Sequence, residues 1–353
     1  MLNGTIGGSI IRGGSVLAAA LFASHSAVGQ VATDAPPAEV VDAIAIDDET
    51  GLPVVKSRED YERLTPQLRD RFNRSRRPGL TTFADVSLKL AAPAELAGRN
   101  GEVRTTSLNA AFGPSFRVSD NADFALRFET NARWYDFRGA SDLLPGAFSD
   151  DEPFDEARVF AVTPVINVVN PDGWNWLAGA RIASSGENSA DFGDTIVGGG
   201  FAAASYPVTS NLRIGGGVLI TSRLAQDGVL VFPIPVIEWF ITDKLSLGTA
   251  QMGGLSLAYE PAFGWRFSLD AGFDRQEFRL DDDGPIAGGA VIDRSIAVSA
   301  SATYSPHPRF GVTATVGADV WGEFQFFSRQ ERLLTDIERE PALFGALSVS
   351  VRF

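Results

Sequence analysis

Hydrophobic and polar residues alternate one by one through several long stretches of this chain. From Phe310 to Phe326 every even-numbered position is hydrophobic or glycine, and most odd-numbered positions are polar or small. Residues 342–353 alternate in the same way, and so do residues 265–274 and 124–134. Because successive side chains of a β-strand point to opposite faces, each stretch is predicted to be a strand with one apolar and one polar face.

The length of these stretches separates a membrane-spanning sheet from a soluble one. The stretch from Phe310 to Phe326 contains nine even-numbered positions and the odd-numbered positions between them. Strands of soluble proteins usually hold only about five to six residues in all. A tilted strand needs about nine to eleven residues to cross a bilayer. Aromatic residues also gather near the ends of the stretches, as at Trp134, Trp239 and Trp265, which is typical of the aromatic girdles at membrane interfaces. We therefore predict an all-β chain that spans a membrane.

The last stretch ends on an aromatic residue, with Val349, Val351 and Phe353 on its apolar face. A terminal strand of this kind resembles the assembly signal of bacterial outer-membrane β-barrel proteins. The resemblance implies a single antiparallel transmembrane β-barrel in the outer membrane. It implies outer-membrane lipids, the barrel-assembly machinery and periplasmic chaperones as partners.

The segment before the strands has a different composition. Residues 1–29 are typical of a secretory signal peptide, with Arg12 before a short apolar core and with Ala27 and Gly29 before a cut at Gln30. Residues 30–79 are first acidic and proline-rich and then contain short helical patterns. They are predicted to be a flexible periplasmic segment or a small plug, and residues 80–353 are predicted to be the barrel.

The number of strands follows from the alternation of short turns with long loops. Outer-membrane barrels keep short turns on the periplasmic side and long loops outside. Tight turns are expected at residues 119–123, 170–173, 207–211, 242–244, 261–263 and 306–308, and polar loops at 94–102, 138–156, 186–194, 224–228, 281–289 and 328–341. An outer turn at residues 251–254 restores the alternation and gives about 14 strands. Twelve is the alternative, because the two strands beside that turn are short.

Candidate chemistry in this chain is sparse. There is no Cys, and the two His are His25, in the predicted signal peptide, and His307, between two prolines of a tight turn. A hydrolytic site needs a base, usually His, so we predict no enzyme and no cofactor. The acidic groups at residues 150–156 and 281–283 lack the spacing of a calcium loop, and no metal site is predicted. The net charge of −14 argues against nucleic acid as a partner.

The polar faces of the strands carry charges of both signs, and strand parity places them inside the barrel. The predicted lumen-lining residues are Lys89, Arg127, Glu129, Arg133, Arg181, Arg213, Arg266, Asp270, Asp274, Asp319 and Glu323. They indicate either a passive pore for small solutes with a mixed-charge lumen or a closed network of Arg–carboxylate pairs in a structural or surface-binding barrel. The size also resembles that of the 14-stranded fatty-acid transporters, which implies a hydrophobic-solute transporter plugged by residues 57–77 as a further alternative. We favour the pore.

Overall fold

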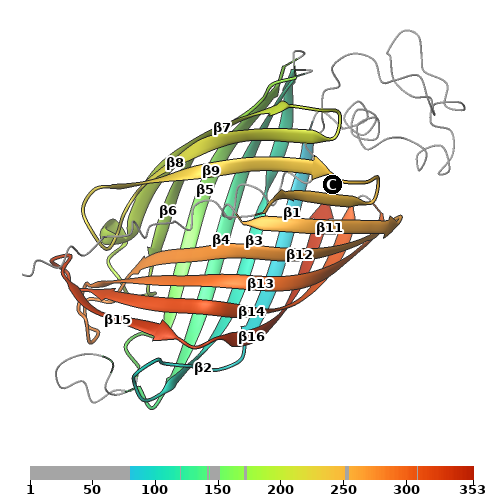
Figure 1. Ribbon diagram of the computed structural model, residues 1–353. Coiled ribbons are helices and arrows are strands. Elements are labelled where there is room, and N and C mark those ends of the chain that lie inside the picture. Colours follow the sequence, from blue (N-terminus) through green and yellow to red (C-terminus); the bar gives the residue numbers. More distant parts are fainter. Residues whose placement is uncertain are drawn as a thin grey trace, which may run out of the picture.

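The computed structural model describes residues 80–119, 121–140, 143, 152–170, 173–250, 254–307 and 309–353. The predicted signal peptide and the segment 30–79 lie outside the described residues. The described part is an all-β barrel (Figure 1), as the alternation predicts. No helix in these ranges is long and apolar enough to cross a membrane.

Fourteen strands form the barrel wall. They are β1 (Leu80–Ala91), β3 (Glu102–Ser119), β4 (Ala122–Arg138), β5 (Glu156–Val169), β6 (Asn175–Gly186), β7 (Ile196–Pro207), β8 (Leu212–Ser222), β9 (Val229–Phe240), β10 (Leu245–Thr249), β11 (Leu255–Ala262), β12 (Trp265–Arg279), β13 (Ala290–His307), β14 (Phe310–Phe327) and β16 (Ala342–Arg352). Two short strands, β2 (Ala94–Glu95) and β15 (Leu333–Arg339), and a 3₁₀ turn, η2 (Phe192–Thr195), lie in the connections. β15 falls in the segment that was predicted to be a polar loop and pairs with β14.

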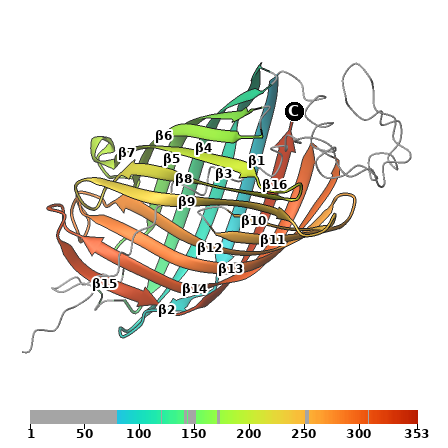
Figure 2. The ribbon, with the colours of Figure 1, turned by 45° about the horizontal axis from the view of Figure 1, so that its top comes forward.

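Each wall strand pairs antiparallel with its two neighbours, and the first and last strands close the ring. β1 pairs with β16 in a register that sets Leu88 opposite Leu347, and β1 also pairs with β3. This confirms the prediction of 14 strands over the alternative of 12. The predicted short turns all lie at one end of the barrel, called here the turn end, and the long connections lie at the other, the loop end. The strands of the near and far walls cross at a steep angle, which shows how strongly they tilt (Figures 1 and 2).

The outer surface of the wall is apolar. Leu343, Val316 and Ile182 are 71%, 67% and 65% exposed, and similar side chains continue around the ring. Exposed apolar patches of this extent are rare on soluble monomers. Near the turn end the aromatic rings cluster, with Trp265 packing on Tyr304 at 4.8 Å between ring centroids and Trp174 on Trp176 at 5.6 Å. An apolar band with an aromatic girdle is the surface of a transmembrane β-barrel.

Candidate functional site: the barrel lumen

The inner wall near the middle of the barrel carries paired charges. Lys89 on β1 binds Asp319 on β14 across β16, with an Nζ–Oδ1 distance of 3.0 Å. Arg127 and Glu129 on β4 pair with each other, and Glu129 also binds Arg181 on β6 across β5. These five residues were predicted to line the lumen, and the structure places each of them in an ion pair, two of the three pairs being between strands.

A second group of charges joins opposite walls of the barrel. Arg133 on β4 donates to Asp274 on β12, at 2.8 Å, and to Asp293 on β13, at 2.7 Å. Asp293, whose side chain is 2% exposed, also accepts from the Tyr135 hydroxyl at 2.9 Å and from Arg339 on β15. A buried carboxylate is stable only when donors surround it, and here two guanidinium groups and a phenol do so. Together with the pairs of Glu129, we call these residues the lumenal ion-pair network.

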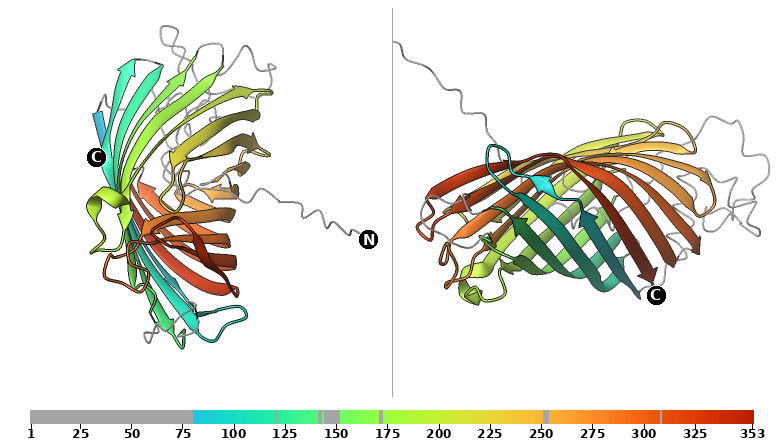
Figure 3. Two further views of the ribbon diagram at one scale, coloured as in Figure 1. Left: turned by 90° about the vertical axis from the view of Figure 1, so that its left-hand side faces the viewer. Right: turned by 90° about the horizontal axis from the view of Figure 1, so that it is seen from below.

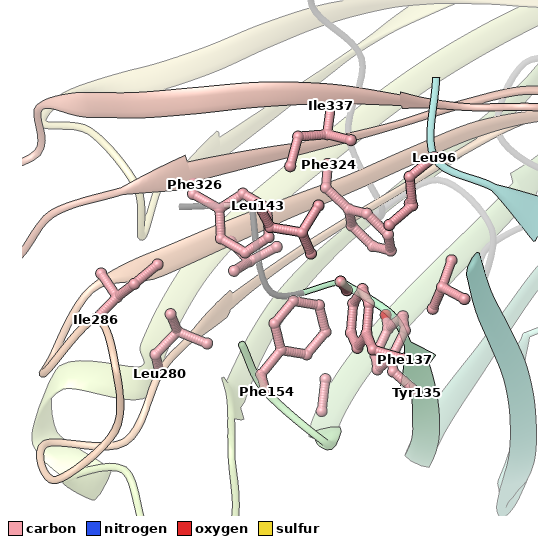
Figure 4. Packing of buried hydrophobic residues seen from close by; sticks show 14 of the residues in the cluster. Leu96, Tyr135, Phe137, Leu143, Phe154, Leu280, Ile286, Phe324, Phe326 and Ile337 are labelled. Carbon is pink, nitrogen blue, oxygen red and sulfur yellow. The ribbon is translucent and has the colours of Figure 1, made fainter. Parts of the chain in front are cut away.

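Above this network, toward the loop end, the interior is filled by apolar side chains. The loop-end cluster consists of Ala94, Leu96, Val103, Tyr135, Phe137, Ala140, Leu143, Phe154, Ala157, Phe278, Leu280, Ile286, Val291, Phe324, Phe326, Ile337 and Ala342. Figure 4 shows the rings of Tyr135 and Phe137 from β4, and of Phe154 just before β5, facing Phe324 and Phe326 from β14. Phe154 packs edge-on against Tyr135 at 4.7 Å and against Phe278 at 5.2 Å. The cluster therefore joins opposite walls of the barrel at the loop end.

The ends of β6 and β12 meet directly, which narrows the barrel further at this level. Gly186 is bridged to Arg279, and the Glu187 N–H donates to the Arg279 carbonyl at 2.9 Å. A Cβ on Gly186 would lie 2.6 Å from Thr195 Cγ2 and 3.2 Å from that carbonyl. The close approach therefore requires glycine at position 186.

One predicted lumenal residue, Glu323, lies on the other face of the wall. Ile296 of β13 pairs with Trp321 of β14, whereas the adjacent Ala297 pairs with Asp319, so Val320 is an extra residue in β14. This β-bulge reverses the faces of β14 beyond it. Glu323 therefore binds Arg294 at 2.5 Å on the outer face. Phe324 and Phe326, which the sequence pattern placed on the apolar outer face, point inward into the loop-end cluster.

The outer face around Glu323 is covered by the loop between β8 and β9. The Leu224 N–H donates to Glu277 at 2.9 Å, and Ala225 packs on Ala290, Ile292 and Phe327. Arg275 pairs with Glu277 beneath the same loop. These charged side chains are buried, so they do not face lipid.

The remaining predicted residues lie closer to the turn end. Arg213 is 3.7 Å from Glu238, Arg266 is 3.4 Å from Glu260, and Asp270 accepts from Ser268 at 2.7 Å. The sequence reasoning missed Tyr135, Asp293, Arg294, Arg275 and Arg339. Asp293 and Arg294 directly precede the alternating part of β13, and extending that strand toward its N-terminal end would have found them.

Two neighbouring rows of the inner wall formed by β7, β8 and β9 are apolar, between the inward Thr221 and the inward Ser205. Cross-strand pairs place Phe201, Leu219 and Phe232 in one inward row, and a second row holds Ala203, Gly217 and Ile234. On the opposite wall the inward rows carry hydroxyl groups, as in the contact of Ser301 with Thr315 at 2.8 Å. The lumen thus has an apolar side and a polar side.

The residues considered above for catalysis or metal binding are not part of the lumenal ion-pair network. His307 is at the turn end, where its Nδ1 accepts from the Arg309 N–H at 3.2 Å. Asp150 and Asp151 lie outside the described residues, and Asp281 and Asp282 lie in the β12–β13 loop. The absence of enzymatic activity stays a prediction.

In a loop-end connection, Glu187 carries a strongly perturbed carboxyl group. Its Oε2 accepts from the Asp281 N–H at 2.5 Å, which links the β6–β7 and β12–β13 loops. Burial raises the pKa of Glu187 to about 7, and the Asp155 and Asp281 carboxylates add to this increase, while the Asp281 N–H opposes it.

No protein-family model matches the sequence, and no curated protein matches it. Among solved structures, the COG4313 outer membrane channel from Pseudomonas putida F1 is 8% identical, with a TM-score of 0.45, over 78% of this chain and 97% of that one. The Pseudomonas putida toluene transporter TodX is 10% identical, with a TM-score of 0.34, over 78% and 90%. The translocator domain of the autotransporter NalP from Neisseria meningitidis is 13% identical, with a TM-score of 0.35, over 78% and 89%. These are likenesses of barrel fold.

Proposed function

We propose that this protein is a transport barrel of a bacterial outer membrane that lets small solutes pass without a cofactor and without turnover. The apolar outer band and the aromatic girdle support the membrane location. The turn end would face the periplasm and the loop end the cell exterior. Residues 1–29 would be removed as a signal peptide, and Val349, Val351 and Phe353 would serve in assembly.

The observation that carries the proposal is the small size of the inward side chains in the turn-end half. A barrel of about eight strands is already wide enough for its side chains to fill the interior, and this one has 14. Several inward positions of the turn-end half are nevertheless small, as at Gly215, Ser205, Ser87, Ser348 and Thr313. Such side chains leave room for a solute. Arg266 and Asp270 are among the charged residues that line this space.

The loop-end cluster and the lumenal ion-pair network close the axis above that space. We therefore expect small, infrequent conductance rather than that of a wide pore. The rival function, a barrel that binds partners through its loops and conducts nothing, would also have a closed axis.

Planar-bilayer recording of the purified full chain separates the two. Stepwise conductance whose ion preference changes on Asp270→Lys, but not on the exposed change Asp136→Lys, supports passage. A wild-type protein that conducts nothing, and that still conducts nothing after the segment up to residue 79 is removed, contradicts passage and favours the binding barrel. Conductance that rises on truncation supports passage and assigns the plug to the N-terminal segment.

A further inference from the structure

Two arginines lie directly opposite each other on the outer face of the wall near the loop end. Arg275 of β12 pairs in register with Arg294 of β13, and their side chains are almost completely buried, at 3% and 6% exposed. Like charges in opposed cross-strand positions repel each other, and the repulsion is stronger away from water. This part of the wall therefore needs negative charge beside the two guanidinium groups.

Two glutamates supply part of that negative charge. Glu323 of β14 pairs with Arg294, and Glu277 of β12 pairs with Arg275. Glu277 is shared, however, because Arg223, which follows β8, approaches the same carboxylate with 3.8 Å between Nε and Oε1. Within the described part of the chain, three mostly buried arginines thus share two buried carboxylates, and one positive charge is left over.

A fourth arginine adds to this surplus. Arg279, the last residue of β12, donates to the main-chain carbonyl groups of Leu224, Asp194 and Gly288, at 3.0, 3.3 and 3.3 Å. Carbonyl groups satisfy its donors but carry no net charge. The Glu338 carboxylate of β15 is on the same face but is exposed, so water weakens its effect. We call these side chains the arginine group: Arg223, Arg275, Arg279 and Arg294 with Glu277 and Glu323.

Three of the arginines also keep a donor unused. The Nε–H groups of Arg223, Arg275 and Arg294 are buried, and none has a hydrogen-bond partner among the residues that the structure describes. A buried donor without a partner destabilises a fold, and more so on a charged group. Surplus positive charge and unused donors in the same place indicate a ligand that is negatively charged and accepts hydrogen bonds.

The arginine group lies at the edge of the apolar outer band. Ile296 and Val298 follow Arg294 on the same face of β13 and are 40% and 47% exposed. The Arg294 guanidinium lies 5.8 Å from the centroid of the Trp321 ring, and tryptophan is typical of the membrane interface. The group is therefore at the level of lipid headgroups, where phosphate is abundant.

The connection between β8 and β9 covers the arginine group at the loop end, which faces the viewer in the left view of Figure 3. Arg223 lies at the start of this connection. It is the most exposed of the three arginines with an unused donor, at 21%. A ligand therefore reaches the buried pair of Arg275 and Arg294 from the side of Arg223.

We propose that the arginine group is a binding site for a phosphate group. Guanidinium groups bind phosphate oxygens through paired N–H donors, and a phosphate brings both the charge and the acceptors that the group lacks. A lipid headgroup in the loop-end leaflet and free phosphate in solution share this chemistry. The site goes beyond the proposed transport function and does not depend on the passage of a solute.

Thermal unfolding of the full chain in non-ionic detergent tests the site and distinguishes the two sources. The probes are phosphatidic acid, which exposes a phosphate monoester, phosphatidylcholine, whose phosphate carries a quaternary ammonium group, and inorganic phosphate. We expect phosphatidic acid to raise the Tm by several degrees over phosphatidylcholine. A rise with phosphatidic acid alone assigns the site to a lipid headgroup, and an equal rise with inorganic phosphate assigns it to a free anion.

Two variants connect the rise to the arginine group. Arg223→Gln removes one cation and one unused donor while the pairs of Arg275 and Arg294 stay intact. Arg158→Gln is the matched control, because Arg158 on β5 is 40% exposed and is paired with Glu156 at 3.1 Å. We expect Arg223→Gln to lose most of the rise in Tm and Arg158→Gln to keep it.

Native mass spectrometry of the same samples measures bound lipid without reference to stability. The wild-type protein should retain phosphatidic acid several-fold more often than phosphatidylcholine, and Arg223→Gln should lose this preference. If neither phosphatidic acid nor inorganic phosphate raises the Tm of the wild-type protein, or if Arg223→Gln responds like the wild type, the site is overturned. None of these outcomes bears on conductance, so the transport function is tested separately by the bilayer recording.

Discussion

Arg133 on β4 and Asp293 on β13 meet inside the barrel, with 2.7 Å between Nη1 and Oδ2, although their strands belong to opposite walls. The neighbouring Tyr135 binds the same carboxylate and also belongs to the loop-end cluster. One side chain thus connects the charged layer with the apolar layer. The two layers therefore form one closure rather than two independent features.

Removing the Asp293 carboxylate should destabilise the barrel strongly. Asp293→Ala leaves Arg339 and one side of Arg133 without their anionic partner, and loss of one partner of a buried ion pair costs about 3–5 kcal/mol. Asp136→Ala is the matched control, because its pair with Arg138 is 2.8 Å long but about half exposed, and exposed pairs contribute about 0–1 kcal/mol. Thermal unfolding in detergent measures both. Equal shifts for the two variants would show that the Asp293 contacts do not hold the walls together.

A charge on the lipid face should cost far more than the same charge on the inner face of the same strand. Val316 points outward and Thr315 inward, next to Ser301. Val316→Arg should lower the free energy of unfolding by about 2–4 kcal/mol if Val316 lies near the midplane, and Thr315→Arg should have a mild effect. Leu269 with Ser268, and Val349 with Ser350, provide two further pairs. Denaturant titration in lipid vesicles tests the assignment, which would be wrong if both members of each pair behaved alike.

The packing of the two loop-end connections around the buried Glu187 carboxyl should weaken as the pH rises, because its ionised form is destabilised by burial. The pKa of this carboxyl is raised from 4.5 to about 7, so the folded state holds a proton that the unfolded state has lost. The stabilising effect is complete below about pH 4.5 and is lost as the pH rises through about 7. Hydrogen exchange of the β6–β7 and β12–β13 loops should be faster at pH 8 than at pH 5.5, after correction for the intrinsic rate. Glu187→Gln should remove most of this difference, and an unchanged pH dependence in that variant would assign it to other groups.

Strand number and the inner and outer faces of most strands could be predicted because period-two alternation and turn residues are local signals. The reversal at Val320 could not, because hydrophobic residues continue at even positions on both sides of the bulge. Phe324 and Phe326 look lipid-facing by parity, and their burial depends on Tyr135, Phe137 and Phe154 of the opposite wall. Contacts between residues so distant in sequence produce no periodic pattern of hydrophobic residues, so the sequence does not predict them.

The proline positions illustrate the same limit in β9. Pro233 and Pro235 look unfavourable in a strand because each removes a donor from the ladder. In the structure both prolines lack their N–H on the edge of β9 that β10 does not reach. The short length of β10 does not by itself predict that the two prolines are tolerated. The register of β9 against β10 decides which N–H groups of β9 would be unpaired.

We expect the loop-end cluster to close the axis of a barrel that otherwise has room for a solute. Single-channel recording of the double variant Phe154→Ala and Phe324→Ala tests it most directly, because these rings come from opposite walls and lie 5.7 Å apart. The matched control is Phe112→Ala with Phe128→Ala, which removes a stacked pair, 5.3 Å between centroids, from the outer face. We predict clearly larger conductance steps for the first variant and wild-type steps for the second. Wild-type conductance in both variants, or a wide open pore in the wild-type protein, would contradict the claim.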